Sequence, residues 1–180
     1  MGQRPIPLNE LGARQATALV SLLHSQAVHS IHASPVLRAQ QTAAILGEAL
    51  SRPVHIEPGL AEIGMGEWEG RYWKDLTEDF NRHNLYLLPD EARPPGGESL
   101  KEVQTRAVAA IERSRDRSES MTALFVTHAD VIRAIVAHYL NFELRTIRQV
   151  RIDHASLTGL EFRENLIDLL FLNVVLPPRP

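Results

Sequence analysis

The sequence predicts an α/β protein, a three-layer sandwich in which helices flank a mostly parallel central sheet. Two observations lead to this prediction. Segments of helical periodicity alternate with short apolar runs along the chain, and residues 123–140 form an apolar run followed directly by a helical pattern. With 180 residues and 44% hydrophobic content, the chain can build one core. We therefore expect a single domain over residues 1–173, followed by a frayed tail over residues 174–180.

The first quarter of the chain predicts two helices and two short strands. Asn9 can cap a helix that runs to about residue 26, and its inward side chains recur at helical spacing: Leu11, Leu19, Leu22 and Leu23. Residues 29–33 form a short strand. Ser34-Pro35 then opens a helix that ends at Leu50, with an apolar stripe of Ala39, Ala43, Leu46 and Leu50. Residues 54–57 are a second strand candidate.

The middle of the chain changes character. Residues 64–95 contain glycines, prolines, mixed charge and both tryptophans, which predicts a partly helical excursion over the active face that ends at Gly96-Gly97. Ser99 and Glu102 have the spacing of a capping box. They predict a helix with an inner face of Val103, Ala107 and Ile111 and a solvated far end over residues 112–120.

The last third predicts a strand, a helix and a hairpin. Residues 123–126 read as a buried strand, and Asp130 can cap a helix with Val131, Ile135 and Tyr139 at helical spacing. Two further strands are expected over residues 156–162 and 166–172. A tight turn over residues 163–165 would join them.

Composition excludes several classes of partner. The formal charge of −3 and the pI near 6.2 provide no polybasic surface, so we expect no nucleic acid and no anionic membrane as a partner. The apolar runs fall short of the roughly 20 residues that a membrane helix needs. Cysteine is absent, which excludes disulfides and thiolate chemistry and fits a cytoplasmic protein.

Three residues carry the chemistry. His128 follows a strand and precedes a helix, the position at which open α/β sheets bind anions. Arg38 lies in the first turns of a helix that follows a strand, and a guanidinium beside a helix N-terminus binds oxyanions strongly. Glu62 precedes a glycine-interrupted aromatic loop, where apolar walls would raise the pKa of its carboxyl and suit it to general-acid catalysis. Taken singly, each residue also fits a purely structural or solvated role.

The order and spacing of four motifs resemble the histidine phosphatase superfamily, which has the phosphoglycerate-mutase-like fold. The motifs are SPVLRAQQTA, LAEIGMGEWEG, RPPGGESL and LFVTHADVIRAIVAHYL. The opening PLNELGARQA is similar to that family's first helix, and RQVRIDHASLTGLEF with LLFLN is similar to its final strands. The resemblance covers nearly the whole chain.

The resemblance implies a role for each residue. Arg38, His128 and the backbone of Ala129 would bind the phosphoryl group, Glu62 would protonate the leaving alcohol and then activate water, and His128 would stabilise the transferring group. This division agrees with what phosphoryl transfer requires from a protein, namely positioning, positive charge and a proton donor. No metal ion and no cofactor are expected. The expected ligands are a small phosphorylated metabolite and inorganic phosphate. A homodimer that forms through the incomplete sheet is one expected partner arrangement.

The sequence departs from the family pattern at two places. The family's nucleophilic histidine lies in an Arg-His-Gly motif on its first strand, and the 180 residues contain no such motif. We therefore expect a phosphoglycerate-mutase-like sheet that lacks its first strand, and we expect this form of the protein to be inactive. In addition, His128-Ala129-Asp130 stands where many relatives have His-Gly-Gly, which places a carboxylate near the anion site.

Two hypotheses follow. In the first, the full-length product is a phosphomonoesterase with a phosphohistidine mechanism, favoured by the intact Arg38, Glu62, His128 and GGES segment. In the second, the chain is a non-catalytic phosphoester-binding or protein-interaction domain. A phosphoglycerate mutase is a further alternative. The chain segment between Glu62 and Gly96 is short, however, and the family resemblance associates a short segment with phosphatases. Trp68, Tyr72 and Trp73 would line a substrate pocket, or alternatively form a small core beneath the loop.

Overall fold

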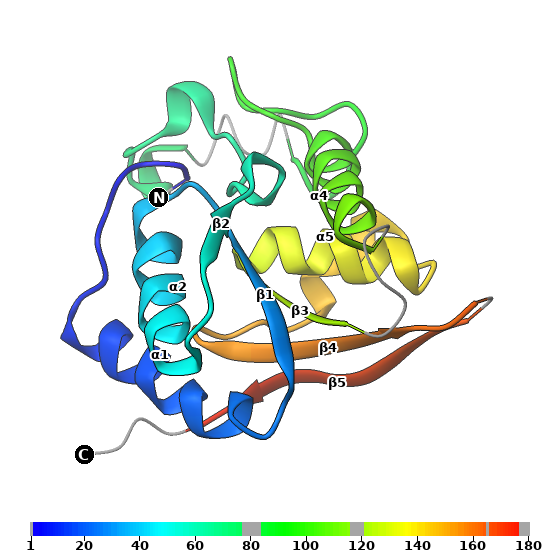
Figure 1. Ribbon diagram of the computed structural model, residues 1–180. Helices are drawn as coiled ribbons and strands as arrows, with labels where there is room; N and C mark the ends of the chain where they lie inside the picture. Colours follow the sequence, from blue (N-terminus) through cyan, green and yellow to red (C-terminus); the bar gives the residue numbers. More distant parts are fainter. Residues whose placement is uncertain (1, 77–83, 116–120, 165, 177–180) are drawn as a thin grey trace.

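The computed structural model describes residues 2–76, 84–115, 121–164 and 166–176 (Figure 1). Its centre is a parallel sheet of three strands in the order β2-β1-β3. The middle strand β1 (Val28–Ala33) pairs in parallel with β2 (Val54–Ile56) and with β3 (Thr122–Val126). In this register Ala33 lies opposite both Ile56 and Val126. The carboxyl ends of the three strands therefore meet at one edge of the sheet.

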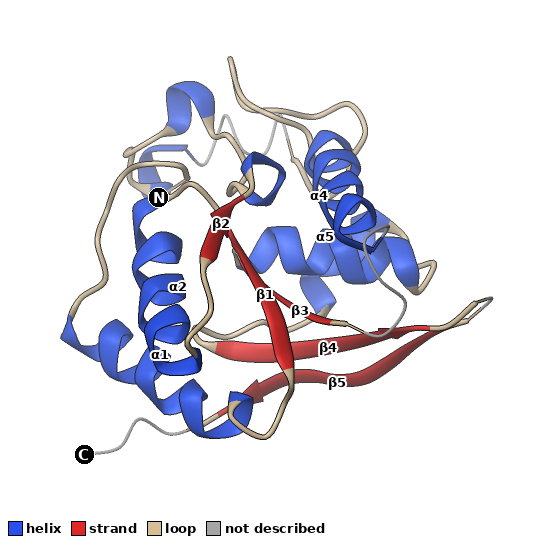
Figure 2. Ribbon diagram, viewed as in Figure 1, coloured by secondary structure: helices blue, strands red, loops and turns tan. Residues whose placement is uncertain are grey.

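Helices cover both faces of this sheet, as Figure 2 shows by colour. On one face, α1 (Glu10–Leu23) and α2 (Leu37–Leu50) pack apolar side chains such as Leu19 and Leu46 against Ile31. On the other face, α4 (Leu100–Arg115) and α5 (Ala129–Tyr139) build the larger cluster. The predicted three-layer α/β sandwich with a mostly parallel sheet is thus confirmed.

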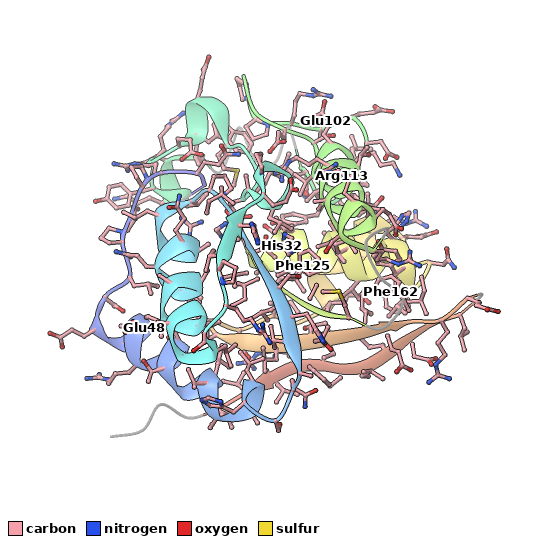
Figure 3. The ribbon with its side chains drawn as sticks, in the orientation of Figure 1. His32, Glu48, Glu102, Arg113, Phe125 and Phe162 are labelled. Carbon is pink, nitrogen blue, oxygen red and sulfur yellow. The ribbon has the colours of Figure 1, made fainter. Side chains whose placement is uncertain are left out.

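Aromatic rings add contacts across the central strands. His32 on β1 and Phe125 on β3 are register partners and lie next to each other in Figure 3. Their ring centroids are 5.2 Å apart in a stacked arrangement. Phe162 stands further along, at the end of a later strand, β4 (Ser156–Phe162), and its ring meets the ring of Tyr139 from α5 edge to face at 4.9 Å. The sheet and the α5 layer are therefore joined by specific ring contacts as well as by aliphatic packing.

A second sheet consists of β4 (Ser156–Phe162) and β5 (Ile167–Val175), which pair antiparallel. Within the described residues, β3 pairs only with β1 and β4 pairs only with β5. Both β3 and β4 nevertheless contribute to the same two clusters: Leu124 and Leu157 pack against the first, and Phe125 and Leu160 against the second. The two sheets thus contribute to the same core clusters, although no ladder of backbone hydrogen bonds joins them among the residues that the structure describes.

Local signals in the sequence predicted several helix boundaries correctly. Asn9 caps α1 as predicted and accepts a hydrogen bond from the Gly12 N–H at 2.8 Å. The capping box of α4 is also present: Ser99 N–H donates to Glu102, and Glu102 N–H donates to Ser99 Oγ. Such reciprocal pairs satisfy backbone donors that a helix N-terminus leaves free. The helix α1 ends at Leu23, three residues before the expected end.

Two predicted helix starts were wrong. The helix α2 begins at Leu37, not at Ser34-Pro35, because Ser34 Oγ accepts hydrogen bonds from Val36 N–H and from a distant histidine. The helix α5 begins at Ala129, with His128 at the N-cap position but without a capping hydrogen bond from its side chain, so Asp130 lies in the first turn rather than at the cap. In both cases a side chain that could have capped the helix serves a long-range contact instead.

The remaining segments follow the predictions with shifts of a few residues. The excursion over residues 64–95 contains short 3-10 helices at Gly66–Trp68 and Trp73–Leu76, while residues 77–83 lie outside the described residues. Part of the expected solvated end of α4, residues 116–120, also lies outside them. The strand β5 extends to Val175 and so includes two residues predicted as tail. Among the described residues, every helix is too short or too polar to cross a membrane.

Candidate active site

The site lies at the carboxyl ends of the three parallel strands. The segment after β1 carries Ser34 and Arg38, the segment after β2 carries Glu62, and the segment after β3 carries His128. Thr127 strengthens this assembly, because its hydroxyl donates to the Leu60 carbonyl at 2.7 Å and ties the end of β3 to the loop before Glu62. Residues that are distant in the sequence converge because parallel strands end at the same edge.

His128 is buried, with 7% of its surface exposed, and both of its ring nitrogens have partners. An Arg38 Nη2–H group donates to Nδ1 at 3.1 Å, so this nitrogen carries no proton. The other nitrogen, Nε2, lies 2.8 Å from Ser34 Oγ and is the donor in that hydrogen bond. These two contacts select one neutral tautomer and fix the ring plane.

The two terminal nitrogens of the Arg38 guanidinium differ: Nη2 forms hydrogen bonds, whereas Nη1 has no hydrogen-bond partner among the described residues. Its Nη2 donates to the Gly2 carbonyl at 2.9 Å as well as to His128, and it lies 3.8 Å from Glu62 Oε2. Its Nη1 is buried and has no hydrogen-bond partner among the described residues. A buried guanidinium N–H without an acceptor costs free energy. This atom therefore marks a position for an acceptor from outside the chain.

Glu62 is held by its backbone. Its carbonyl accepts hydrogen bonds from Arg106 Nη2 at 3.1 Å and from Gln3 Nε2 at 2.8 Å. Its carboxyl accepts the Ile63 N–H at 3.0 Å, and the second oxygen lies 3.8 Å from His128 Nδ1. The carboxyl therefore faces the same space as Arg38 and His128.

Arg106 organises the loop that carries Glu62. From α4 it donates to the carbonyls of Gly59 and Ala61, at 2.8 and 2.7 Å, in addition to Glu62. It also forms a bidentate ion pair with Glu98 at 2.8 and 2.9 Å, and Glu98 in turn accepts the Gly64 N–H. Burial alone would raise the pKa of Glu98, but the hydrogen bonds from Arg106 and Gly64 lower it below the usual value, so the pair remains ionised.

The pKa values of Glu62 and His128, the two titratable groups of the site, are shifted in opposite directions. Burial, followed by the nearby Asp130 carboxylate, raises the pKa of Glu62 to about 7, and these effects outweigh the opposing charges of Arg38 and Arg106. Burial, followed by Arg38 and Arg106, lowers the pKa of His128 to about 3. At neutral pH, His128 is therefore neutral, and the Glu62 carboxyl is close to its own pKa, so both its protonated and its ionised forms are accessible. A carboxyl with this pKa can both donate and accept a proton near neutral pH.

Asp130 connects the site to the excursion above it. One of its oxygens accepts from Tyr86 Oη at 3.1 Å, and the other accepts from Arg133 at 2.8 Å. The Arg148 guanidinium lies over the Tyr86 ring, 4.8 Å from its centroid. Burial and Asp130 raise the pKa of Tyr86 above its usual value, so its hydroxyl remains the donor. These contacts hold the segment around residue 86 against the N-terminus of α5.

The structure brings together Arg38, Glu62 and His128, and Ala129 is the first residue of α5 beside them. The three aromatic residues predicted to line a substrate pocket lie in different environments. Trp68 is 3% exposed and belongs to the core cluster, as the alternative interpretation expects, whereas Tyr72 is 73% exposed. Trp73 begins a short 3-10 helix, and its side chain is outside the description.

Sequence reasoning missed three residues that shape the site: Ser34, Glu98 and Arg106. The sequence predicts Ser34 only as part of a helix start. Its contact with His128 spans 94 positions, so no local pattern indicates it. Glu98 belongs to the GGES segment that the resemblance includes, which was a usable signal. No signal in the sequence indicated Arg106, because an arginine in an amphipathic helix is usually a surface residue.

Fold and site together define a class of α/β protein in which an arginine, a neutral histidine and a protonatable carboxyl lie together at the carboxyl ends of parallel strands. A sequence profile of the histidine phosphatase superfamily, branch 1, matches residues 1–175. The chain belongs to this superfamily.

Individual relatives agree with the assignment. A protein of Yersinia pestis named probable phosphoglycerate mutase GpmB is 30% identical over 166 residues, which cover 91% of this chain and 77% of the relative. The α-ribazole phosphatase of Shigella flexneri superposes with a TM-score of 0.84 and 25% identity, over 99% of this chain and 90% of that one. A mycobacterial glucosyl-3-phosphoglycerate phosphatase in complex with inorganic phosphate has a TM-score of 0.83 and 25% identity, over 97% and 91% of the two chains.

Proposed function

We propose that the site binds the phosphoryl group of a small phosphorylated metabolite and that the protein functions as a phosphomonoesterase of the histidine phosphatase type. One observation carries the proposal: Arg38, whose Nη2 lies beside Glu62 and His128, has a buried Nη1–H group without a hydrogen-bond partner among the described residues. A phosphoryl oxygen would satisfy this donor. The inorganic phosphate bound by the mycobacterial relative supports the same ligand class.

Each residue then has a distinct task. Arg38 would donate to the phosphoryl oxygens and neutralise their charge, as guanidinium groups do in phosphate sites. His128, oriented by Ser34, would lie beside the transferring group and hold the Arg38 guanidinium through its Nδ1. Glu62 would transfer its proton to the oxygen of the leaving alcohol as the phosphorus–oxygen bond breaks, and would then take a proton from the attacking water.

The nucleophile is the part of this scheme that the 180 residues do not contain. The family resemblance assigns it to a histidine in an Arg-His-Gly motif, and that motif is absent from this sequence. A full-length form that supplies the histidine would form and hydrolyse a phosphohistidine. The 180 residues alone would bind phosphate and phosphoesters and hydrolyse them slowly, because removing a covalent nucleophile leaves only binding and electrostatic contributions.

We favour a phosphatase over a mutase. The chain has a short excursion between Glu62 and Gly96, and two similar structures are phosphatases by name. A mutase is the alternative, because the similar protein GpmB is named a probable phosphoglycerate mutase. The scheme requires no metal ion and no cofactor. We propose a small phosphorylated metabolite as the ligand and the cytoplasm as the compartment.

A non-catalytic phosphoester-binding domain is the second candidate, favoured by the absence of Arg-His-Gly from these residues. The two candidates differ in one measurement. If extending the chain upstream with a strand that ends in Arg-His-Gly yields turnover of para-nitrophenyl phosphate on the order of 1 per second or more, the protein is an enzyme. If the extended chain binds phosphate without turnover, the binding function is correct.

Phosphate or vanadate titration followed by amide chemical shifts tests the anion site itself. We expect perturbations at Arg38, Glu62, His128 and Ala129. Replacing Arg38→Ala should weaken binding by at least about tenfold, or roughly 1.4 kcal/mol. The matched control is Arg113→Ala, which removes an exposed arginine that pairs with Glu57 away from the site and should leave affinity unchanged. Equal affinity of the Arg38→Ala variant would refute the proposed site.

A further inference from the structure

Asp130 adds a negative charge beside Glu62. It lies two residues after His128, in the first turn of α5, and its side chain is only 17% exposed. After burial, its carboxylate has the largest effect on the pKa of Glu62, ahead of the charges of Arg38 and Arg106. An electrostatic effect of this rank requires a short distance between the two carboxyl groups. The site therefore has a cationic part at Arg38 and an acidic part at Asp130.

Two donors hold the Asp130 carboxylate in place. Its Oδ2 accepts a hydrogen bond from Tyr86 Oη at 3.1 Å, and its Oδ1 accepts one from Arg133 Nη1 at 2.8 Å. Arg133 also donates its Nε–H to the Val150 carbonyl at 2.8 Å, which ties the guanidinium to the segment that follows α5. Arg133 is not among the main charges that act on Glu62, whereas Asp130 is. The carboxylate, rather than its arginine partner, therefore acts on the proposed general acid.

The cationic and acidic parts of the site are not paired with each other. Among the described residues, Arg38 lies 3.8 Å from Glu62, whereas Asp130 forms its ion pair with Arg133. In the proposed reaction the phosphoryl group binds Arg38, and the alcohol portion begins at the oxygen that receives the Glu62 proton. Substituents on the first carbons of the alcohol therefore come close to the Asp130 carboxylate.

We propose that Asp130 determines the specificity of this site: it selects phosphomonoesters whose alcohol portion carries an ammonium group and disfavours those whose alcohol portion carries a carboxylate. This preference rests on the phosphate-binding function proposed above and names its substrate class. An ammonium group can donate charge-assisted hydrogen bonds to the Asp130 oxygens, whereas a carboxylate is repelled by them. A phosphoglycerate carries such a carboxylate. Asp130 therefore favours a phosphatase for amino-alcohol phosphates over a phosphoglycerate mutase.

Three phosphomonoesters with the same two-carbon skeleton test this preference. They are phosphoethanolamine, which ends in an ammonium group, 2-hydroxyethyl phosphate, which ends in a hydroxyl, and phosphoglycolate, which ends in a carboxylate. Calorimetry measures their affinities for the 180-residue protein at about pH 7.5, where the ammonium and the carboxylate are both ionised. We expect affinity to fall in that order, by at least about tenfold from first to last, because the charge near Asp130 is reversed. Equal affinities, or tightest binding of phosphoglycolate, would overturn the proposal.

Asp130→Asn removes the charge and keeps the shape of the side chain. Its amide oxygen can accept from Arg133, and its amide N–H can donate to the Tyr86 hydroxyl. This variant should reduce the contrast between phosphoethanolamine and phosphoglycolate to less than about threefold. Asp168→Asn is the matched control, because it removes an aspartate that is also paired with an arginine, Arg163 at 3.1 Å, but lies on β5. It should leave the contrast unchanged, and an unchanged contrast in Asp130→Asn would contradict the assigned role.

Tyr86→Phe separates the charge of Asp130 from its structural contacts. This variant removes one hydrogen bond to Asp130 but keeps the carboxylate, so the contrast between the esters should persist. Loss of the contrast in Tyr86→Phe would assign it to the surrounding structure and overturn the role of the charge.

Inorganic phosphate distinguishes this inference from the proposed function, because phosphate has no alcohol portion. If phosphate binds through Arg38 and the three esters bind without discrimination, only the specificity of Asp130 is refuted. If phosphate itself does not bind, the proposed function is refuted, and the specificity with it.

Discussion

Replacing Glu62→Gln should stabilise the protein at neutral and alkaline pH. The pKa of Glu62 is raised from 4.5 to about 7, mainly by burial and secondarily by Asp130. The folded state therefore binds this proton more tightly than the unfolded state. The corresponding stability is complete below pH 4.5 and is lost as the pH rises through 7. Glutamine resembles the protonated carboxyl at every pH and avoids this loss.

The magnitude follows from the shift. A rise of about 2.5 pKa units at about 1.4 kcal/mol each corresponds to about 3 kcal/mol of unfolding free energy. The side chain is only 17% exposed, so solvent screens this effect little. The competing contribution is attraction between Glu62 and Arg38, whose charged atoms are 3.8 Å apart. Because burial and Asp130 outweigh that attraction, the Glu62→Gln variant should match the wild type near pH 4.5 and exceed its stability by about 3 kcal/mol at pH 8.

Urea denaturation at several pH values between 4.5 and 8 measures this difference, and carbon chemical shifts of the Glu62 carboxyl report its titration directly. Glu112→Gln is a control with the opposite sign. Burial would raise the pKa of Glu112, but hydrogen bonds from Tyr139 and Arg115 hold it below the usual value, so this variant should lose stability at neutral pH and recover it at low pH. If Glu62→Gln is less stable than the wild type at pH 8, the ion pair with Arg38 dominates and the reasoning is refuted.

Four further predictions concern the site and the sheet. The 180-residue protein should hydrolyse para-nitrophenyl phosphate far more slowly than about 1 per second between pH 5 and 8; enzyme-like turnover would contradict the need for the missing nucleophile. Ser34→Ala should destabilise the fold by about 1–3 kcal/mol in urea denaturation, because His128 Nε2 loses its buried partner; an unchanged midpoint would show that the hydrogen bond is dispensable. Arg106→Met should cost about 2–4 kcal/mol in the same assay, since three loop carbonyls and Glu98 lose their donor, and an effect below about 1 kcal/mol would exclude this supporting role. A synthetic peptide that copies the first strand of a full-length relative should raise the Tm by pairing with the open edges of β3 and β4, and an unchanged Tm would refute the expectation of a missing strand.

Local patterns in the sequence determined much of the fold. The cap at Asn9, the reciprocal pair of Ser99 and Glu102 and the bounds of β4 agree with the structure, because each depends on neighbours within a few positions. The order of apolar runs and helical segments likewise predicted a parallel sheet between helical layers. The motifs around Arg38, Glu62 and His128 were visible in the sequence through their order and their resemblance to a family.

Contacts between distant residues decided the rest. Ser34 and Asp130 are ordinary helix-capping residues by their local sequence, yet one holds His128 across 94 positions and the other binds Tyr86 across 44. Trp68 could equally have lined a pocket, and only the packing of the excursion on α4 and α5 buried it. The pKa values of Glu62 and His128 depend on burial and on charges from other elements. Burial and the charges of distant residues act on a side chain only once the chain has folded. The sequence therefore determined the elements and the candidate residues. The tertiary structure decided which partners these residues have, how they are protonated and how far they are exposed.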